Sequence, residues 1–134
     1  MKAAENLIDS RPLVLVAEDD ESNFKLIKAI IQKKYRIEWA RNGEEMVSLF
    51  KQYQADVVAL LMDIKMPVMN GLEATQIIRE MSGEIPIIIQ TAYAFNADKE
   101  AALKSGATEV LVKPITLKAL RGCLSKYVPE IDWN

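Results

Sequence analysis

The sequence predicts an α/β fold: a doubly wound, five-stranded parallel sheet. Short apolar runs alternate five times with longer segments in which apolar residues follow helical spacing. This alternation is typical of parallel strands that helices bury on both faces. The chain has 134 residues, of which 50% are hydrophobic, so one domain can bury an adequate core without metals or disulfides.

The predicted strands are short and mostly apolar. They cover Leu13–Ala17, Arg36–Ala40, Val57–Met62, Pro86–Gln90 and Glu109–Val112. Four of them are almost wholly apolar, as expected for strands covered on both faces. The second alternates apolar and polar residues through Ile37, Glu38 and Trp39, which indicates an edge strand with one face partly exposed to water.

The segments between the strands carry the core faces of helices. The predicted faces are Phe24, Ile27 and Ile31; Met46, Leu49, Phe50 and Tyr53; and Leu72, Ile77 and Ile78. A fourth helix should follow Asn96, its N-cap, and stop at Gly106. A fifth should start near Thr116 and bury Leu117, Leu120, Leu124 and Tyr127.

Right-handed strand–helix–strand units predict the flavodoxin-like strand order 2-1-3-4-5. We expect an N-terminal linker at residues 1–11, the domain at 12–128 and a tail at 129–134, in which Trp133 could dock on the domain. In such sheets the functional crevice lies at the carboxyl ends of the strands. Residues that carry chemistry are therefore expected at that edge of the sheet.

Composition excludes several functions. Seventeen Lys and Arg against 19 Asp and Glu give a net charge of −2, so we expect no direct binding to nucleic acid. No apolar run is long enough to span a membrane. A single cysteine, Cys123, cannot form an internal disulfide and fits a reducing, cytoplasmic setting. The absence of histidine rules out Ser-His-Asp catalysis and histidine-ligated metals within the chain.

Polar residues end four of the predicted strands. They are Glu18, Asp19 and Asp20 after the first strand, Asp63 after the third, Thr91 after the fourth and Lys113 after the fifth. Clustered carboxylates repel one another, so a compensating cation is expected, and oxygen ligands of this kind suit Mg²⁺. A phosphoryl group on Asp63 would then be met by Mg²⁺, the Lys113 ammonium and the Thr91 hydroxyl.

At this point the sequence resembles a known family. The stretches LVLVAEDDESN, LLMDIKMPVMNG, PIIIQTAYA and VLVKPIT occur in this order within residues 12 to 128. They are similar to the receiver domains of bacterial two-component signalling, the fold of chemotaxis-type response regulators. The resemblance implies that Asp63 is the phosphoacceptor, that Lys113 contacts the phosphoryl group and that Thr91 is the switch hydroxyl.

The resemblance also implies a metal site. Glu18 and Asp19 match the family's acidic pair, with Asp19 as the direct Mg²⁺ ligand, Glu18 acting through water and the backbone carbonyl of Lys65 completing the set with Asp63. Asp20 either belongs to this cluster or caps the helix that follows. Met66, Pro67 and Gly71 match the family's loop, and the Lys113–Pro114 bond is expected to be cis.

Two positions depart from the family pattern or tune it. Val110 stands where the family usually has an aromatic switch residue, so a neighbouring side chain or a backbone shift is expected to carry the signal instead. Tyr93, two residues after Thr91, is bulky enough to screen an attacking water, which predicts a long-lived phosphorylated state. The family also implies weak Mg²⁺-dependent self-phosphorylation and dephosphorylation.

The expected partners are a histidine kinase or histidine phosphotransfer domain as donor, and a downstream output domain or protein. The chain is either a free-standing regulator or a receiver from a hybrid kinase. A small Mg²⁺-dependent phosphatase is an alternative, but such enzymes carry a second Asp where this chain has Lys65. A pseudo-receiver that only binds partners is disfavoured because every central site residue type is present.

Overall fold

The computed structural model describes residues 9–92 and 96–128. Strands and helices alternate along these residues. In chain order they are β1 (Leu13–Ala17), α1 (Glu21–Ile31), β2 (Arg36–Ala40), α2 (Gly43–Tyr53), β3 (Val57–Asp63), α3 (Gly71–Met81), β4 (Ile87–Thr91), α4 (Asn96–Ser105), β5 (Glu109–Val112) and α5 (Leu117–Tyr127). The five strands and five helices confirm the predicted alternation.

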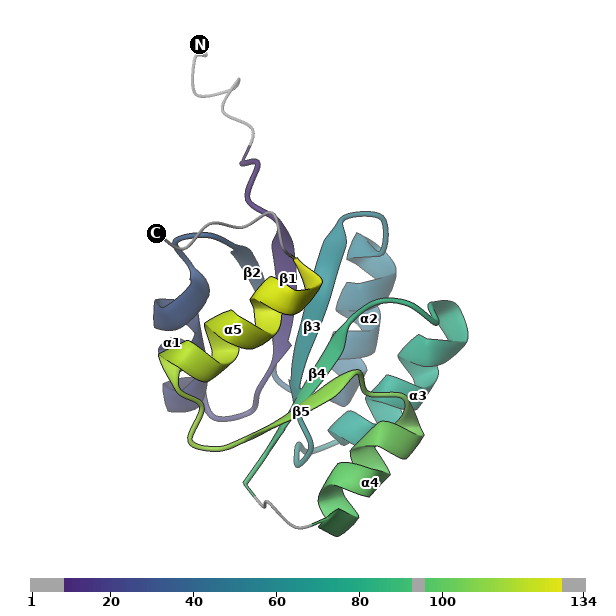
Figure 1. Cartoon of the computed structure of the whole chain (residues 1–134). Coiled ribbons are helices and arrows are strands. Elements are labelled where there is room, and N and C mark those ends of the chain that lie inside the picture. Colours follow the sequence, from purple (N-terminus) through teal and green to yellow (C-terminus); the bar gives the residue numbers. More distant parts are fainter. Residues whose placement is uncertain (1–8, 93–95, 129–134) are drawn as a thin grey trace.

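The strands form one parallel sheet in the order β2-β1-β3-β4-β5. This confirms the fold class and places β2 at an edge, as its alternating sequence predicts. Helices α1 and α5 cover one face of the sheet, and α2, α3 and α4 cover the other (Figure 1). Because all strands run the same way, their carboxyl ends share one edge of the sheet.

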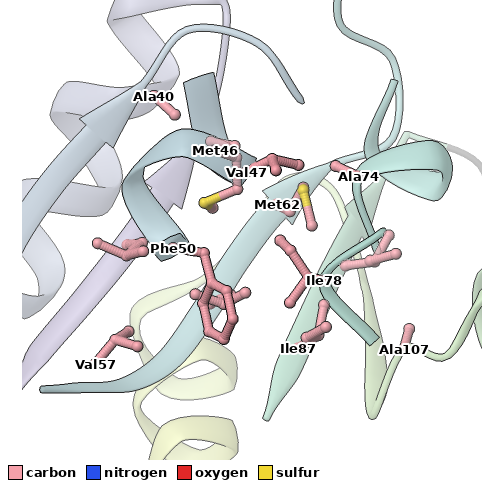
Figure 2. Close-up of a cluster of buried hydrophobic side chains, with 14 of the residues drawn as sticks. Ala40, Met46, Val47, Phe50, Val57, Met62, Ala74, Ile78, Ile87 and Ala107 are labelled. Atoms are coloured by element: carbon pink, nitrogen blue, oxygen red, sulfur yellow. The ribbon is translucent and has the colours of Figure 1, made fainter. Parts of the chain in front are cut away.

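Two apolar layers hold the helices on the sheet. The layer under α2, α3 and α4 includes Phe50, Met62, Ile78 and Ile87, which converge in Figure 2. The layer under α1 and α5 includes Ile27, Leu61 and Leu120. Alternate residues of each central strand enter opposite layers, which explains why these strands are apolar throughout.

Side-chain caps fix where the helices begin. Asp20 accepts hydrogen bonds from the backbone N–H groups of Ser22 and Asn23, at 2.8 and 3.2 Å, and so caps α1. This settles the alternative for Asp20 in favour of the cap. Asn70 and Glu73 form a capping box at α3, and Thr116 caps α5 as its sequence predicts.

Strand boundaries differ from the predicted ones by one residue. β3 extends to Asp63, which pairs with Gln90, and β4 runs from Ile87 to Thr91. Pro86 cannot donate to the ladder because it lacks an N–H, although its carbonyl accepts from Leu60. Asp63 and Thr91 are therefore the last residues of their strands and are held in the ladder.

The prediction for one side of α5 was wrong. Leu117 is 49% exposed, whereas Ile115, just before the cap, is 5% exposed and fills the apolar layer in its place. Leu120 and Leu124 are buried as predicted, together with Cys123. Tyr127 is only partly buried, because its hydroxyl reaches outward and donates to the Glu109 carboxylate at 2.7 Å.

Candidate functional site

The carboxyl ends of β1, β3, β4 and β5 bring Glu18, Asp63, Thr91 and Lys113 together. Asp63 is 7% exposed and lies at the end of the most central strand, and Thr91 is 3% exposed at the end of β4. Lys113 follows β5, and its backbone N–H donates to the Thr91 carbonyl at 2.7 Å. The predicted convergence of these residues on one edge is therefore observed.

Lys113 bridges the two buried carboxylates. Its Nζ lies 2.9 Å from Asp63 Oδ2 and 3.6 Å from Glu18 Oε1. Burial alone would lower the pKa of Lys113, but the hydrogen bond to Asp63 and the charges of Asp63 and Glu18 raise it overall. The ammonium thus stays charged beside Asp63. The Lys113–Pro114 peptide bond is cis, as the resemblance implies.

Glu18 is completely buried, which is unusual for a carboxylate. Burial raises the pKa of Glu18 to about 7, helped by the nearby charge of Asp63 and opposed by hydrogen bonds and by Lys113. Its donors are the side-chain amides of Asn23 and Gln90 and the backbone N–H of Asp20. The carboxylate is therefore held by neutral donors on several sides.

Three carboxylates form a candidate metal site. Glu18, Asp19 and Asp63 each offer an oxygen, and these oxygens lie within 4.8 Å of one another. Asp19 is exposed, while the other two are buried. An all-oxygen donor set with one solvent-facing carboxylate suits Mg²⁺, which retains waters when it binds proteins. The residues present fit the predicted ion.

A hollow of about 170 Å³ opens beside Asp63. It is lined by Asp63, Ile64, Lys65, Thr91, Ala92, Asp98 and Lys113. Thr91 and Lys113 lie on its walls together with Asp63, so an anion attached to Asp63 would have both a hydroxyl and an ammonium beside it. Lys65 is exposed and also lines the hollow.

The loop after Asp63 approaches the strand closely. A Cβ at Gly71 would lie 2.1 Å from the Asp63 carbonyl oxygen, so no other residue fits there without a shift of the backbone. Within the loop, the Met69 N–H donates to the Pro67 carbonyl at 2.7 Å, and Val68 between them has a φ of 69°. This is a γ-turn in its strained form, with a β-branched residue at positive φ.

Trp39 supports the loop that carries the acidic pair. Its indole Nε1–H donates to the Glu18 backbone carbonyl at 2.8 Å. The ring stacks on Phe24 with centroids 4.2 Å apart, and the Arg41 guanidinium lies 4.0 Å above it. These contacts tie the edge strand β2 to the end of β1.

Sequence reasoning missed three residues near the site. Asn23 and Gln90 bind Glu18, and Asp98 lines the hollow. Gln90 gave a usable signal, because it is an amide directly after the apolar run Ile87–Ile89 in the same predicted strand. Val110 is half-buried in β5 and packs against the layer under α2, α3 and α4. Tyr93 and Trp133 lie outside the described residues.

The chain matches a known protein family. Residues 14–125 match the response regulator receiver domain family, so the chain belongs to that family and is a receiver domain of two-component signalling, a phosphorylation-controlled signalling class. It is 40% identical over 129 residues to hybrid signal transduction histidine kinase I of Dictyostelium discoideum, covering 87% of this chain and 7% of the kinase. It is 34% identical to the kinase BarA of Escherichia coli K12, covering 87% of this chain and 13% of BarA.

Solved structures agree. The receiver domain of the sensor kinase PA1611 of Pseudomonas aeruginosa, solved with magnesium in its active site cleft, is 29% identical with a TM-score of 0.83, covering 90% of this chain and all of that one. The receiver of Ssk1 from Saccharomyces cerevisiae, solved with the phosphotransfer protein Ypd1, is 28% identical with a TM-score of 0.81, covering 92% and 95%.

The chain thus spans only a small part of the hybrid kinases that it matches. Among the helices of the described residues, none is both long and apolar enough to cross a lipid bilayer.

Proposed function

We propose that Asp63 is a phosphoacceptor that takes its phosphoryl group from a phosphohistidine on a histidine kinase or histidine phosphotransfer domain. The carrying observation is the buried Asp63 carboxylate, 2.9 Å from the Lys113 ammonium and beside two further carboxylates at the mouth of a hollow. Lys113 and Thr91 receive the transferred group, and the resulting state changes a surface that an output domain or protein reads.

The transfer needs little covalent chemistry from the protein. An Asp63 carboxylate oxygen forms a bond to phosphorus while the bond from phosphorus to the donor's imidazole nitrogen breaks, and the bonding electron pair stays with the imidazole. Lys113 offers a fixed positive charge to the phosphoryl oxygens, and Thr91 offers a hydroxyl from the wall of the hollow. Positioning and charge compensation therefore carry the reaction.

Glu18, Asp19, Asp63 and the Lys65 carbonyl would hold Mg²⁺. When bound, the ion would supply positive charge that offsets the carboxylates and the charge developing on the phosphoryl oxygens. Glu18 is completely buried and acts through water in this proposal, and its neutral donors orient it. Asp19 is the exposed member and is the direct ligand in this proposal.

The donor comes from another chain or domain, because this sequence has no histidine. A cytoplasmic setting fits the family and the single buried cysteine. With Mg²⁺ and a small phosphodonor, the domain would also phosphorylate itself slowly and lose the group by hydrolysis.

Mass spectrometry after incubation with Mg²⁺ and acetyl phosphate tests the proposal. We expect a gain of one phosphoryl group that disappears in Asp63→Asn. Asp56→Asn is the matched control, because Asp56 is an exposed aspartate that pairs with Arg36 away from the site. Full labelling of Asp63→Asn, or none of the native protein, would contradict the proposal.

A further inference from the structure

Gln90 occupies an unexpected place at the carboxyl end of β4. It is completely buried, precedes Thr91 and pairs in register with Asp63 on the neighbouring strand. The three residues before it in β4 are isoleucines, all buried. An amide in such surroundings loses its hydration and needs hydrogen-bond partners to compensate.

The amide nitrogen of Gln90 has such a partner, and it lies two strands away. Gln90 Nε2 donates to Glu18 Oε1 at 3.2 Å, across the end of β3. Asn23 Nδ2, from α1, donates to the same oxygen, and Lys113 Nζ lies 3.6 Å from it. Two amides, from β4 and α1, and an ammonium from the loop after β5 therefore surround Oε1.

The other oxygen of Glu18 is less occupied. Among the described residues, Oε2 accepts a hydrogen bond from the Asp20 N–H at 3.2 Å. Since a carboxylate oxygen has capacity for about two partners, Oε2 is the oxygen that can turn toward a cation or its water. The donors on Oε1 thus fix the orientation of the carboxylate and leave Oε2 with more capacity for a further partner.

The amide oxygen of Gln90 indicates that this arrangement lowers the stability of the fold. Within the described part of the chain, Gln90 Oε1 is buried and has no hydrogen-bond partner. Turning the amide over would place this oxygen against the Glu18 carboxylate, so the observed orientation is the one that chemistry permits. An apolar side chain of similar size would avoid the unsatisfied oxygen altogether.

We propose that Gln90 is a positioning residue that orients the Glu18 carboxylate for Mg²⁺. The proposal rests on the proposed function, because it assigns a task within the same metal site. Gln90 is not one of the proposed ligands. Carboxylates that bind metals are commonly hydrogen-bonded by residues outside the ligand set. Gln90 acts in this way: its hydrogen bond fixes the orientation of Glu18 and favours the charged form of the carboxylate.

Replacement of Gln90 by methionine separates this task from a structural one. Gln90→Met keeps the length of the side chain and removes both the donor and the unsatisfied oxygen. We expect Mg²⁺ to bind about tenfold more weakly by isothermal titration calorimetry. In urea without Mg²⁺, the unfolding midpoint should be unchanged or higher. Gln76→Met, on the exposed side of α3, should change neither quantity.

We expect the Mg²⁺ affinity and the unfolding midpoint to change independently, so the proposal can be contradicted by experiment. Native-like Mg²⁺ affinity in Gln90→Met would overturn it, and so would a parallel loss of affinity and stability. Gln90→Leu is a second variant with a smaller, branched side chain. Failure of both variants to fold would also overturn it, since the amide would then serve the fold itself.

Labelling of the native protein keeps this test distinct from that of the proposed function. If acetyl phosphate labels native Asp63 while Gln90→Met binds Mg²⁺ normally, only the role of Gln90 fails. If the native protein binds Mg²⁺ but is never labelled, the phosphoacceptor assignment fails while the role of Gln90 can still be measured.

Discussion

The two ends of β4 each hold a half-buried cation, and the two cations are treated differently. At the amino end, Arg79 of α3 donates to the carbonyls of Gly106, Ser82 and Ile85 and to the Thr108 hydroxyl, at 2.7 to 3.2 Å. All of these acceptors are neutral. At the carboxyl end, Lys113 faces the carboxylates of Asp63 and Glu18.

The difference indicates that the cation at the amino end of β4 stabilises the fold, whereas the cation at the carboxyl end serves the chemistry of the site. The Arg79 guanidinium uses its fork of donors to tie the end of α3, the loop before β4 and the loop after α4 into one unit. Lys113 is a point charge among acids that repel one another, and it offsets part of that repulsion while it faces the position of a transferred anion. Substitutions at the two ends should therefore affect different measurements.

Removal of Lys113 should give the largest effect. In Lys113→Ala, the rate of labelling of Asp63 by acetyl phosphate should drop by about a hundredfold, because a preorganised charge facing the transferred group is lost. Quenched time points analysed by mass spectrometry measure this rate. Lys126→Ala, which removes an exposed lysine paired with Glu109, is the control and should label normally. Equal labelling rates in Lys113→Ala and Lys126→Ala would contradict the role assigned to the carboxyl end of β4.

Removal of Arg79 should instead affect folding. Arg79→Ala removes four hydrogen bonds, three of them to backbone carbonyls, and should lower the free energy of unfolding by about 2 to 4 kcal/mol. Urea denaturation followed by circular dichroism measures the change. Labelling of Asp63 by the folded fraction should stay at the native rate. A large loss of labelling rate in the folded variant would mean that the two ends are coupled.

The pH dependence of Mg²⁺ binding sharpens the picture of the carboxyl end. The folded-state pKa of Glu18, about 7, exceeds its ordinary value of 4.5, so the folded protein without Mg²⁺ binds more protons in that window. Its stability should therefore decrease as pH rises through that window. Mg²⁺ requires the ionised carboxylate, so affinity should rise with pH up to about 7, by at most about tenfold per unit.

Calorimetric titrations of Mg²⁺ at several pH values between about 5.5 and 7.5 measure this slope. Glu18→Gln should bind Mg²⁺ more weakly and show a flatter slope, because the titrating group is gone. A slope in the native protein that Glu18→Gln retains in full would assign the proton to another residue.

The smallest expected effect concerns the strained turn beside the site. Val68→Gly should raise the free energy of unfolding by up to about 1 kcal/mol, since the relief of a positive φ exceeds the entropy that glycine loses on folding. Thermal denaturation measures it. Val112→Gly is the control, because Val112 lies in the extended strand β5 and its loss should destabilise. A destabilised Val68→Gly would show that the turn carries no strain.

Residue patterns predicted the layers and the strand order because burial on both faces leaves a direct record in apolar runs such as Leu13–Ala17. They also predicted that Asp63, Glu18 and Lys113 converge, because parallel strands end at one edge. One error had a local cause that the prediction overlooked, and the other depended on tertiary packing. Pro86 lies before β4 because the ladder needs an N–H, and Leu117 is exposed because Ile115 occupies the layer first.

The side chains that bind Glu18 could not be predicted from the sequence, because they depend on tertiary placement. Its donors come from α1 and β4, so the hydrogen bonds from Asn23 and Gln90 depend on tertiary placement rather than on spacing. Only the polarity of Gln90 within an apolar strand pointed to it. By contrast, Asp20 was predictable as a cap, because capping is local. Its partners, Ser22 and Asn23, lie two and three residues further along the chain.

The absence of a side chain at Gly71 has a mechanical consequence. With only hydrogen between them, the first residue of α3 rests directly on the peptide that carries Asp63, and the Gly71 N–H donates to the Ile64 carbonyl at 2.8 Å. A small movement of that peptide therefore reaches the helix without a compressible side chain to absorb it. The bare backbone at this position acts as a rigid coupling between the end of β3 and an entire helix.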